Sequence, residues 1–186
     1  MITTTILSRS LEEFLQQSET KPALEFIEGN IFQKPMPQGE HSTIQAELIS
    51  TINQITKPKK IAYALPELRC TFGENRSIVP DVVVFRWERI PRNEKGRIAN
   101  RFNTYPDWSI EILSPAQSYT KVLDSLLFCS QHGTELGWLI NPEEEVIFVV
   151  FKEQKVQLFR GQDVLPVLEN VDLTLTVDDI FAWLNV

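Results

Sequence analysis

The pattern of apolar and polar residues predicts two long helices. Between His41 and about Lys57, apolar residues recur at spacings of four, four and three, which lays one apolar stripe along a helix. A second helix is predicted over the segment SYTKVLDSLLFCSQHG, where Gly133 is a typical C-terminal stop. Each helix therefore has one face that must pack against another part of the protein.

Four apolar segments around these helices are predicted to be strands. They read IAYALPELRCTF, PDVVVFRW, WSIEIL and LGWLIN. Their β-branched and aromatic residues favour strands, and three of the segments are apolar enough for a buried sheet. Because a helix connects WSIEIL to LGWLIN, we expect these two strands to be parallel neighbours.

Shorter elements are expected nearer the two ends of the chain. Ser10, with Glu13 three residues later, forms a capping box that opens a short helix. The segment LEFIEGNIFQKPMP predicts a hairpin around Gly29, and VIFVVFKEQKVQLFR predicts a second hairpin before a short final helix near residues 179–184. The order of hairpin, helix, three strands, helix, strand and β extension is typical of an α/β fold.

Length and composition favour one globular unit. The chain has 186 residues and 42% hydrophobic content, so we expect a single domain over residues 1–186. No apolar run approaches the roughly 18 residues of a membrane helix, and no secretory signal is evident, so a cytoplasmic protein without membrane association is expected. Cys70 and Cys129 lie in apolar contexts without a CxxC pair, which predicts buried free thiols.

Charge is distributed unevenly along the chain. The net charge of -7 argues against a protein that coats nucleic acid non-specifically. Residues 143–186 carry nine acids and three bases, whereas residues 86–101 carry two acids and six bases. The six bases are Arg86, Arg89, Arg92, Lys95, Arg97 and Arg101. Most of them lie in the irregular segment 88–106, which we interpret either as a loop that contacts DNA phosphates or as a solvated charged loop.

Two acids within apolar strands point to metal chemistry. Asp81 begins one strand and Glu111 lies inside the next, so neighbouring strands can bring both carboxylates to one end of the sheet. Buried carboxylates repel each other unless a cation or a shared proton compensates, and Mg²⁺ prefers oxygen ligands. The alternative is that Asp81 caps a turn after Pro80 and that Glu111 pairs with an arginine of the basic segment.

The combination of an amphipathic helix, PDVVVF, IEILSP, a helix and GWLINP resembles the Uma-type bacterial proteins of the restriction-endonuclease-like superfamily, whose signature is PD…(D/E)xK. The resemblance runs from about Leu24 to Pro142. It implies a mixed-sheet core of helix, three strands, helix and strand, to which the pattern of residues adds the N-terminal hairpin and the C-terminal β-hairpin extension. It also implies that Asp81 and Glu111 bind Mg²⁺, with Mn²⁺ as an alternative ion.

Two further positions match the family pattern. Glu25, in EFIEG, would supply a third acidic metal ligand, and His41 would orient water or a phosphate. The local alternatives are an exposed glutamate ahead of a hairpin turn and a histidine that caps or packs at a helix start.

The expected lysine is absent from its usual places. Leu113 stands two residues after Glu111, and Ser125 stands at the alternative position in the following helix. Lys121 lies one helical turn before Ser125 and is the available substitute. Its alternative role is that of a solvated surface lysine.

Three functions follow from these residues. The first is an Mg²⁺-dependent endonuclease that cleaves phosphodiester bonds in DNA, with Asp81, Glu111, Lys121 and His41 as catalytic residues and Asp81, Glu111 and Glu25 as metal ligands. The second is a catalytically weak or inactive nuclease-fold domain that binds nucleic acid or protein, which the missing lysine and the acidic charge favour. The third is a structural protein that dimerises through its C-terminal hairpin, and a homodimer is expected because exposed strand edges permit it.

Overall fold

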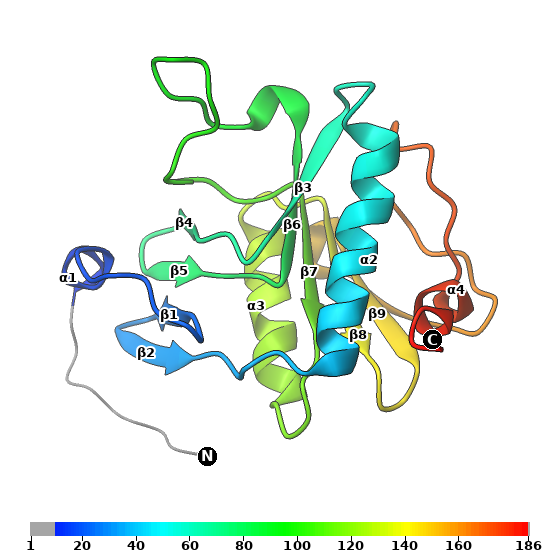
Figure 1. Ribbon diagram of the computed structural model, residues 1–186. Coiled ribbons are helices and arrows are strands. Elements are labelled where there is room, and N and C mark those ends of the chain that lie inside the picture. Colours follow the sequence, from blue (N-terminus) through cyan, green and yellow to red (C-terminus); the bar gives the residue numbers. More distant parts are fainter. Residues whose placement is uncertain (1–9, 186) are drawn as a thin grey trace.

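A mixed six-stranded sheet forms the centre of the protein (Figure 1). The computed structural model describes residues 10–185. The strand order is β10-β9-β8-β7-β6-β3, and β7 and β8 run parallel as predicted. The strands are β3 (Ala62–Pro66), β6 (Val82–Arg86), β7 (Trp108–Ile112), β8 (Leu136–Asn141), β9 (Val146–Phe151) and β10 (Val156–Arg160).

The two predicted long helices cover opposite faces of this sheet. Helix α2 (Gly39–Thr56) buries its apolar stripe, including Leu48, in the larger core with Val84 and Trp138. Helix α3 (Tyr119–Gln131) packs Leu126 on the other face, against Leu139 and Val150. A short helix α4 (Val177–Ala182) completes the core on the α2 side. Burial of these apolar faces is the main force that fixes both helices on the sheet.

A smaller antiparallel sheet lies beside the central one and has the order β2-β1-β5-β4 (Figure 1). Its strands are β1 (Leu24–Ile27), β2 (Asn30–Gln33), β4 (Cys70–Phe72) and β5 (Arg76–Ile78). The predicted hairpin is confirmed, because β1 and β2 pair around Gly29, which has a φ of +84°. The remaining elements are the capping-box helix α1 (Leu11–Leu15) and two 3₁₀ turns, Trp87–Arg89 and Lys152–Gln154.

The segment IAYALPELRCTF does not form one strand. It divides into β3 in the central sheet and β4 in the smaller sheet. The break falls at Glu67, whose φ of 42° is left-handed and redirects the chain after Pro66. Strand β5 has no counterpart in the sequence prediction, because it is short and begins with the polar pair Arg76-Ser77.

Two other expectations, for the thiols and for the C-terminal hairpin, are confirmed by the structure. Cys70 and Cys129 are both buried and free. The C-terminal hairpin forms β9 and β10 and extends the central sheet. Within residues 10–185, no helix combines the length and the apolar character needed to cross a membrane.

The pairing of β6 with β7 positions the two predicted acids. These strands are antiparallel, with Val82 opposite Ile110. Continuing this register by one residue brings Asp81 opposite Glu111, on the sheet face that α3 and the smaller sheet cover. The link from β2 to α2, Lys34–Gln38, crosses this same end of the sheet (Figure 1).

Candidate functional site

Asp81 and Glu111 lie side by side at one end of the central sheet. Their residues are only 3% and 4% exposed. The Ile112 backbone N–H donates to Asp81 Oδ2 over 2.7 Å, so the neighbouring strand fixes this carboxylate directly. The Gln45 side chain also donates to the Asp81 backbone carbonyl over 2.8 Å. The structure therefore brings the predicted acid pair together.

The cation between these acids is Lys34, which directly follows β2. Its Nζ lies 2.8 Å from Asp81 Oδ1, 3.0 Å from Glu111 Oε2 and 2.8 Å from the Val79 carbonyl oxygen. An ammonium has three donors, and these three oxygens use all of them. Sequence reasoning missed Lys34 because it lies 47 and 77 positions from the two acids. No local spacing signals such a contact.

His41 and Glu25 reach the same place from different elements. His41, in the first turn of α2, is buried and has its Nε2 3.1 Å from Asp81 Oδ2. Its Nδ1 has no hydrogen-bond partner among the described residues. Glu25, on β1, accepts a 2.8 Å hydrogen bond from the Val79 N–H. His41 thus orients one acid, while Glu25 is held beside the pair by the backbone of Val79.

Lys121 lies at the margin of this group. It is exposed in the first turn of α3, and its Nζ lies 5.0 Å from the centroid of the Phe32 ring. It lines the same cavity as Glu111 and Glu25 but forms no ion pair with either acid in the described part of the chain. Lys121 therefore borders the cavity that the acids also border, with its ammonium over the Phe32 ring rather than on a carboxylate.

The carboxyl groups of the site differ in their affinity for protons. Burial alone would raise the pKa of Asp81, but Lys34 and His41 hold that pKa well below its ordinary value. Burial raises the pKa of Glu111 well above its ordinary value, and it also raises the pKa of Glu25, with Lys34 offsetting part of each shift. Burial opposes the charge on Lys34, yet the three acids raise its pKa. Two buried carboxylates therefore contact one ammonium, and a third carboxyl, that of Glu25, lies near enough to act on it electrostatically.

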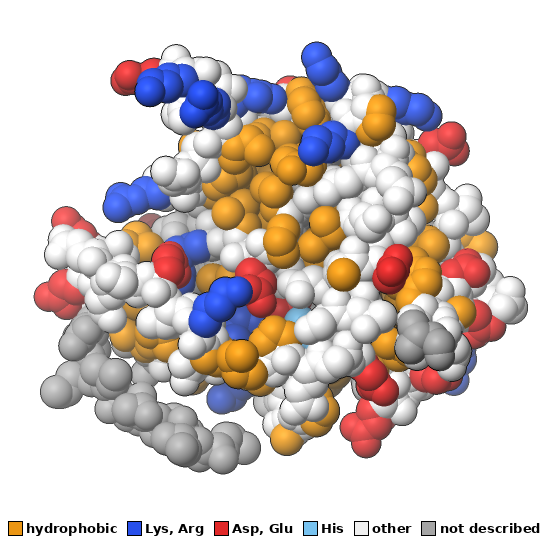
Figure 2. All heavy atoms as spheres, viewed as in Figure 1, with side chains coloured by type: hydrophobic (Ala, Val, Ile, Leu, Met, Phe, Trp, Pro, Cys, Tyr) orange, Lys and Arg blue, Asp and Glu red, His pale blue; other side chains and the backbone are white. Residues whose placement is uncertain are grey.

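Two cavities flank Lys34. One, of about 420 Å³, is lined by Asp81 and His41, and the other, of about 350 Å³, is lined by Glu111 and Glu25. Lys34 lines both cavities, as do Pro35 and Gln117. Charged side chains of both signs gather on this face of the molecule (Figure 2). The β2–α2 link thus separates two hollows that each open onto one of the paired acids.

The oxygen atoms around Lys34 suit a hard cation in their chemistry. Carboxylate and carbonyl oxygens are the ligands that Mg²⁺ and Mn²⁺ prefer, and three of them already converge on a positive charge. Within residues 10–185, no three His, Cys, Asp or Glu side chains are grouped so that they could hold a metal ion. In this arrangement, the ammonium of Lys34 occupies the position at which these oxygen atoms converge.

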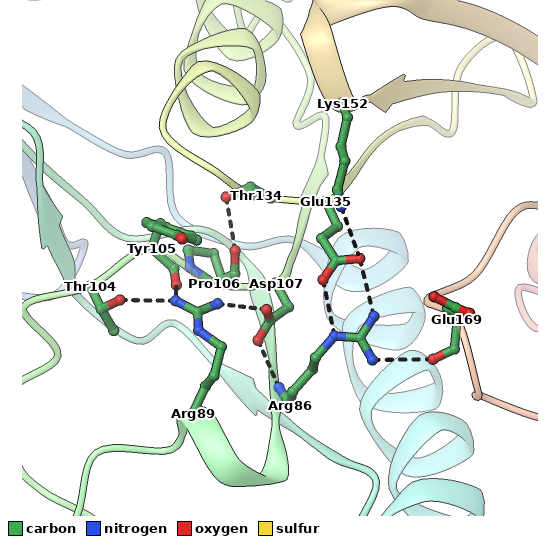
Figure 3. A network of polar contacts seen from close by, with 10 residues as sticks. All are labelled: Arg86, Arg89, Thr104, Tyr105, Pro106, Asp107, Thr134, Glu135, Lys152 and Glu169. Atoms are coloured by element: carbon green, nitrogen blue, oxygen red, sulfur yellow. Dashed lines mark hydrogen bonds and ion pairs between the residues drawn. The ribbon is translucent and has the colours of Figure 1, made fainter.

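Part of the predicted basic surface serves the fold (Figure 3). Arg86 forms a two-pronged ion pair with Glu135 at 3.0 and 3.1 Å, and Arg89 contacts the buried Asp107. The other four bases, Arg92, Lys95, Arg97 and Arg101, are exposed. Their loop joins β6 to β7 at the end of the sheet away from Asp81, but it folds back so that Asn100 lines the same cavity as Asp81.

A mixed sheet between two helices, with acids on adjacent strand ends, is the architecture of restriction-endonuclease-like proteins. The chain belongs to the Uma2 family, described as "Putative restriction endonuclease", whose family model matches residues 11–178. The family relation confirms the resemblance found in the sequence.

Among solved structures, the chain is similar to one from Anabaena variabilis ATCC 29413 described as "a putative nuclease belonging to DUF820". The two are 53% identical, with a TM-score of 0.92, and the match covers 95% of this chain and 99% of that chain. This similarity confirms the mixed α/β fold. No curated protein matches the chain.

Proposed function

We propose that this protein is a divalent-metal-dependent endonuclease that hydrolyses phosphodiester bonds in DNA. The observation that carries the proposal is the convergence of two buried carboxylates, those of Asp81 and Glu111, on a single ammonium at one end of the sheet, with Glu25 beside them. Buried like charges without full compensation cost stability, and such groups concentrate at functional sites. Membership of a family of restriction-endonuclease type supports the same conclusion.

Asp81 and Glu111 would hold Mg²⁺ or Mn²⁺, with Glu25 as a third acid on the wall of the adjoining cavity. When bound, the ion would supply Lewis-acid stabilisation of the negative charge on the phosphate. His41 fixes the orientation of Asp81 through its contact with Oδ2. The Ile112 N–H restrains the same oxygen, so Asp81 is preorganised by two donors.

Lys34 supplies the ammonium that the sequence pattern lacks at Leu113 and Ser125. It reaches the acids from the hairpin rather than from β7 or α3. A lysine in this place neutralises charge that develops on a phosphate. Lys121 would meet the same phosphate from the solvent side of the cavity that Glu111 lines.

The exposed part of the basic loop would contact the DNA backbone. Lys95, Arg97 and Arg101 are exposed and can release counterions on binding phosphates. Arg86 and Arg89 hold the base of the loop through their ion pairs instead. We expect the first group to affect DNA affinity and the second to affect stability.

Cleavage assays with plasmid and oligonucleotide DNA test the proposal. We expect cleavage with Mg²⁺ or Mn²⁺ but not with EDTA, and a loss of about 10²–10³-fold for Asp81→Asn. Lys121→Met should reduce cleavage, whereas Lys155→Met, at an exposed lysine before β10, should not. Equal rates for the parent and Asp81→Asn would remove the acid pair from the reaction.

A second candidate function is binding without cleavage. It is favoured by the Lys34 ammonium, which already neutralises Asp81 without an added ion. This function predicts that the parent and Asp81→Asn bind DNA equally in a gel-shift assay and that neither cleaves it with any divalent ion.

We also propose that the chain forms a homodimer and that residues 1–186 make up a single domain. Strand β10 is an edge of the central sheet, and its first residue, Val156, is 40% exposed. An exposed edge strand is a common dimer contact. Size-exclusion chromatography with light scattering would measure the assembly, and Val156→Lys should weaken it if β10 forms the contact.

A further inference from the structure

Lys34 is coordinated by oxygen atoms in the manner of a bound ion. Its Nζ has three oxygen neighbours at 2.8, 2.8 and 3.0 Å, from Val79, Asp81 and Glu111. Only 13% of its side chain is exposed. Such burial of an ammonium is unfavourable unless its partners compensate fully, and here the compensation comes from the proposed metal ligands themselves.

We propose that Lys34 is a resident counter-ion that competes with the divalent ion for Asp81 and Glu111. This inference rests on the proposed function, because it takes these acids as the metal ligands. Lys34 stabilises the ion-free protein, and it must leave its position before an ion is held there. The chain's own lysine thereby limits the affinity for metal.

The ammonium of Lys34 and a divalent ion cannot occupy this position together, because of the distances involved and because both are positively charged. Divalent ions such as Mg²⁺ bind oxygen at about 2.0–2.1 Å, and the Asp81 and Glu111 oxygens that face Lys34 cannot serve both cations. A divalent ion beside the ammonium would also experience direct repulsion, which is weakly screened where the acids are only 3% and 4% exposed. Held at this point, the two cations therefore exclude each other.

The surroundings allow Lys34 to move without unfolding the core. Its side chain borders a cavity of about 420 Å³ on one side and a cavity of about 350 Å³ on the other. Lysine has a flexible four-carbon stem, so its ammonium can turn into either space while β2 stays paired with β1. Displaced in this way, Lys34 remains at the border of the cavities that Asp81 and Glu111 line.

Metal titration of the full chain without DNA tests the competition. The variants are Lys34→Met, which keeps the stem and removes the charge, and Lys155→Met as a control at an exposed lysine. In EDTA, Lys34→Met should melt at least about 5 °C below the parent, because two buried acids lose their cation. In calorimetric titration it should bind Mn²⁺ at least about tenfold more tightly than the parent. Lys155→Met should match the parent in both measurements.

Chemical labelling of the parent protein provides a measurement that needs no variant. An amine-acetylating reagent should modify Lys34 slowly in EDTA, because its ammonium is buried and paired. Saturating Mn²⁺ should raise the rate at Lys34 by at least about fivefold if the side chain is displaced. The rate at Lys155, followed in the same mass spectra, should stay constant.

Two outcomes would overturn the inference. One is a Lys34→Met variant that binds Mn²⁺ no more tightly than the parent, and the other is a labelling rate at Lys34 that Mn²⁺ leaves unchanged. Neither result decides whether the protein is a nuclease, because DNA cleavage and its loss in Asp81→Asn are measured separately. Conversely, a parent that binds Mn²⁺ in competition with Lys34 but cleaves no DNA would support the inference and overturn the proposed function.

Discussion

The two ends of the central sheet bury acids in opposite ways. At the end where β7 begins, Asp107 is buried and accepts hydrogen bonds from Arg89 and from the Arg86 N–H (Figure 3). At the other end, Asp81 and Glu111 share the single ammonium of Lys34, and Glu25 lies beside them without a cation of its own in contact among the described residues. The first end has matched charges and satisfied oxygens, whereas the second has excess acid. The comparison separates a polar network that maintains the fold from one that is suited to binding a cation.

The polar contacts around Asp107, at the end where β7 begins, connect several segments of the chain. Arg86 connects β6 to Glu135, which directly precedes β8, and Lys152 approaches the same carboxylate at 3.7 Å. The Thr134 hydroxyl donates to the Pro106 carbonyl over 2.8 Å (Figure 3). These contacts join the base of the basic loop to the neighbouring strand, so their effect should be on stability.

The largest expected effect on the free energy of unfolding comes from replacing Asp107. Replacing it in Asp107→Asn leaves the Arg89 guanidinium without its anionic partner, and we expect a loss of about 3 kcal/mol in the free energy of unfolding. Urea denaturation followed by circular dichroism measures this loss. The response of the melting temperature to Mn²⁺ should persist in this variant. A change in that response would mean that the two ends of the sheet are coupled rather than independent.

At the end of the sheet that holds Asp81 and Glu111, removing an acid is expected to increase the free energy of unfolding rather than to lower it. Glu111→Gln removes one of three acids that face a single cation, so we expect a gain of about 1 kcal/mol in the free energy of unfolding without metal. The same variant should lose its response to Mn²⁺. Glu143→Gln, at an exposed acid, serves as the matched control and should change neither quantity. Destabilisation by Glu111→Gln would show that this end is already balanced.

A smaller, pH-dependent effect is expected at Glu135. The hydrogen bonds from Arg86 hold the pKa of Glu135 below its ordinary value of 4.5. The folded state therefore prefers the charged form, and the stabilisation is present above pH 4.5 and disappears as the pH falls through the lower folded-state pKa. We expect Glu135→Gln to cost about 1 kcal/mol at neutral pH and less in acid. A cost that does not depend on pH would point to packing instead.

The smallest expected signal is the reaction of the two thiols with a labelling reagent in the folded protein. Burial raises the pKa of Cys70 to about 12 and also raises that of Cys129, so neither forms a reactive thiolate near neutral pH. A thiol-specific reagent at pH 8 should label neither residue in the folded protein and both in urea. Rapid labelling without denaturant would show that the core around them opens readily.

Several parts of the fold and site were predictable from local pattern. The stripe on α2 and the parallel pair of β7 and β8 follow from periodicity and connection type, because these features are encoded over short stretches. Asp81 and Glu111 were predicted as a pair because they lie on apolar strands that follow each other in the chain. The identity of their cation was not predictable, because Lys34 comes from a hairpin distant in sequence.

The sequence by itself determined the two long helices, most of the central strands and the pairing of Asp81 with Glu111, since these follow from the spacing of apolar residues along the chain. Only the tertiary structure decided that Lys34 lies between those acids, that Arg86 and Arg89 are used within the fold, and that residues 61–72 divide between two sheets. The physical reason is that electrostatic contacts depend on distance in space. Chain folding brings together charges whose positions in the sequence carry no common period.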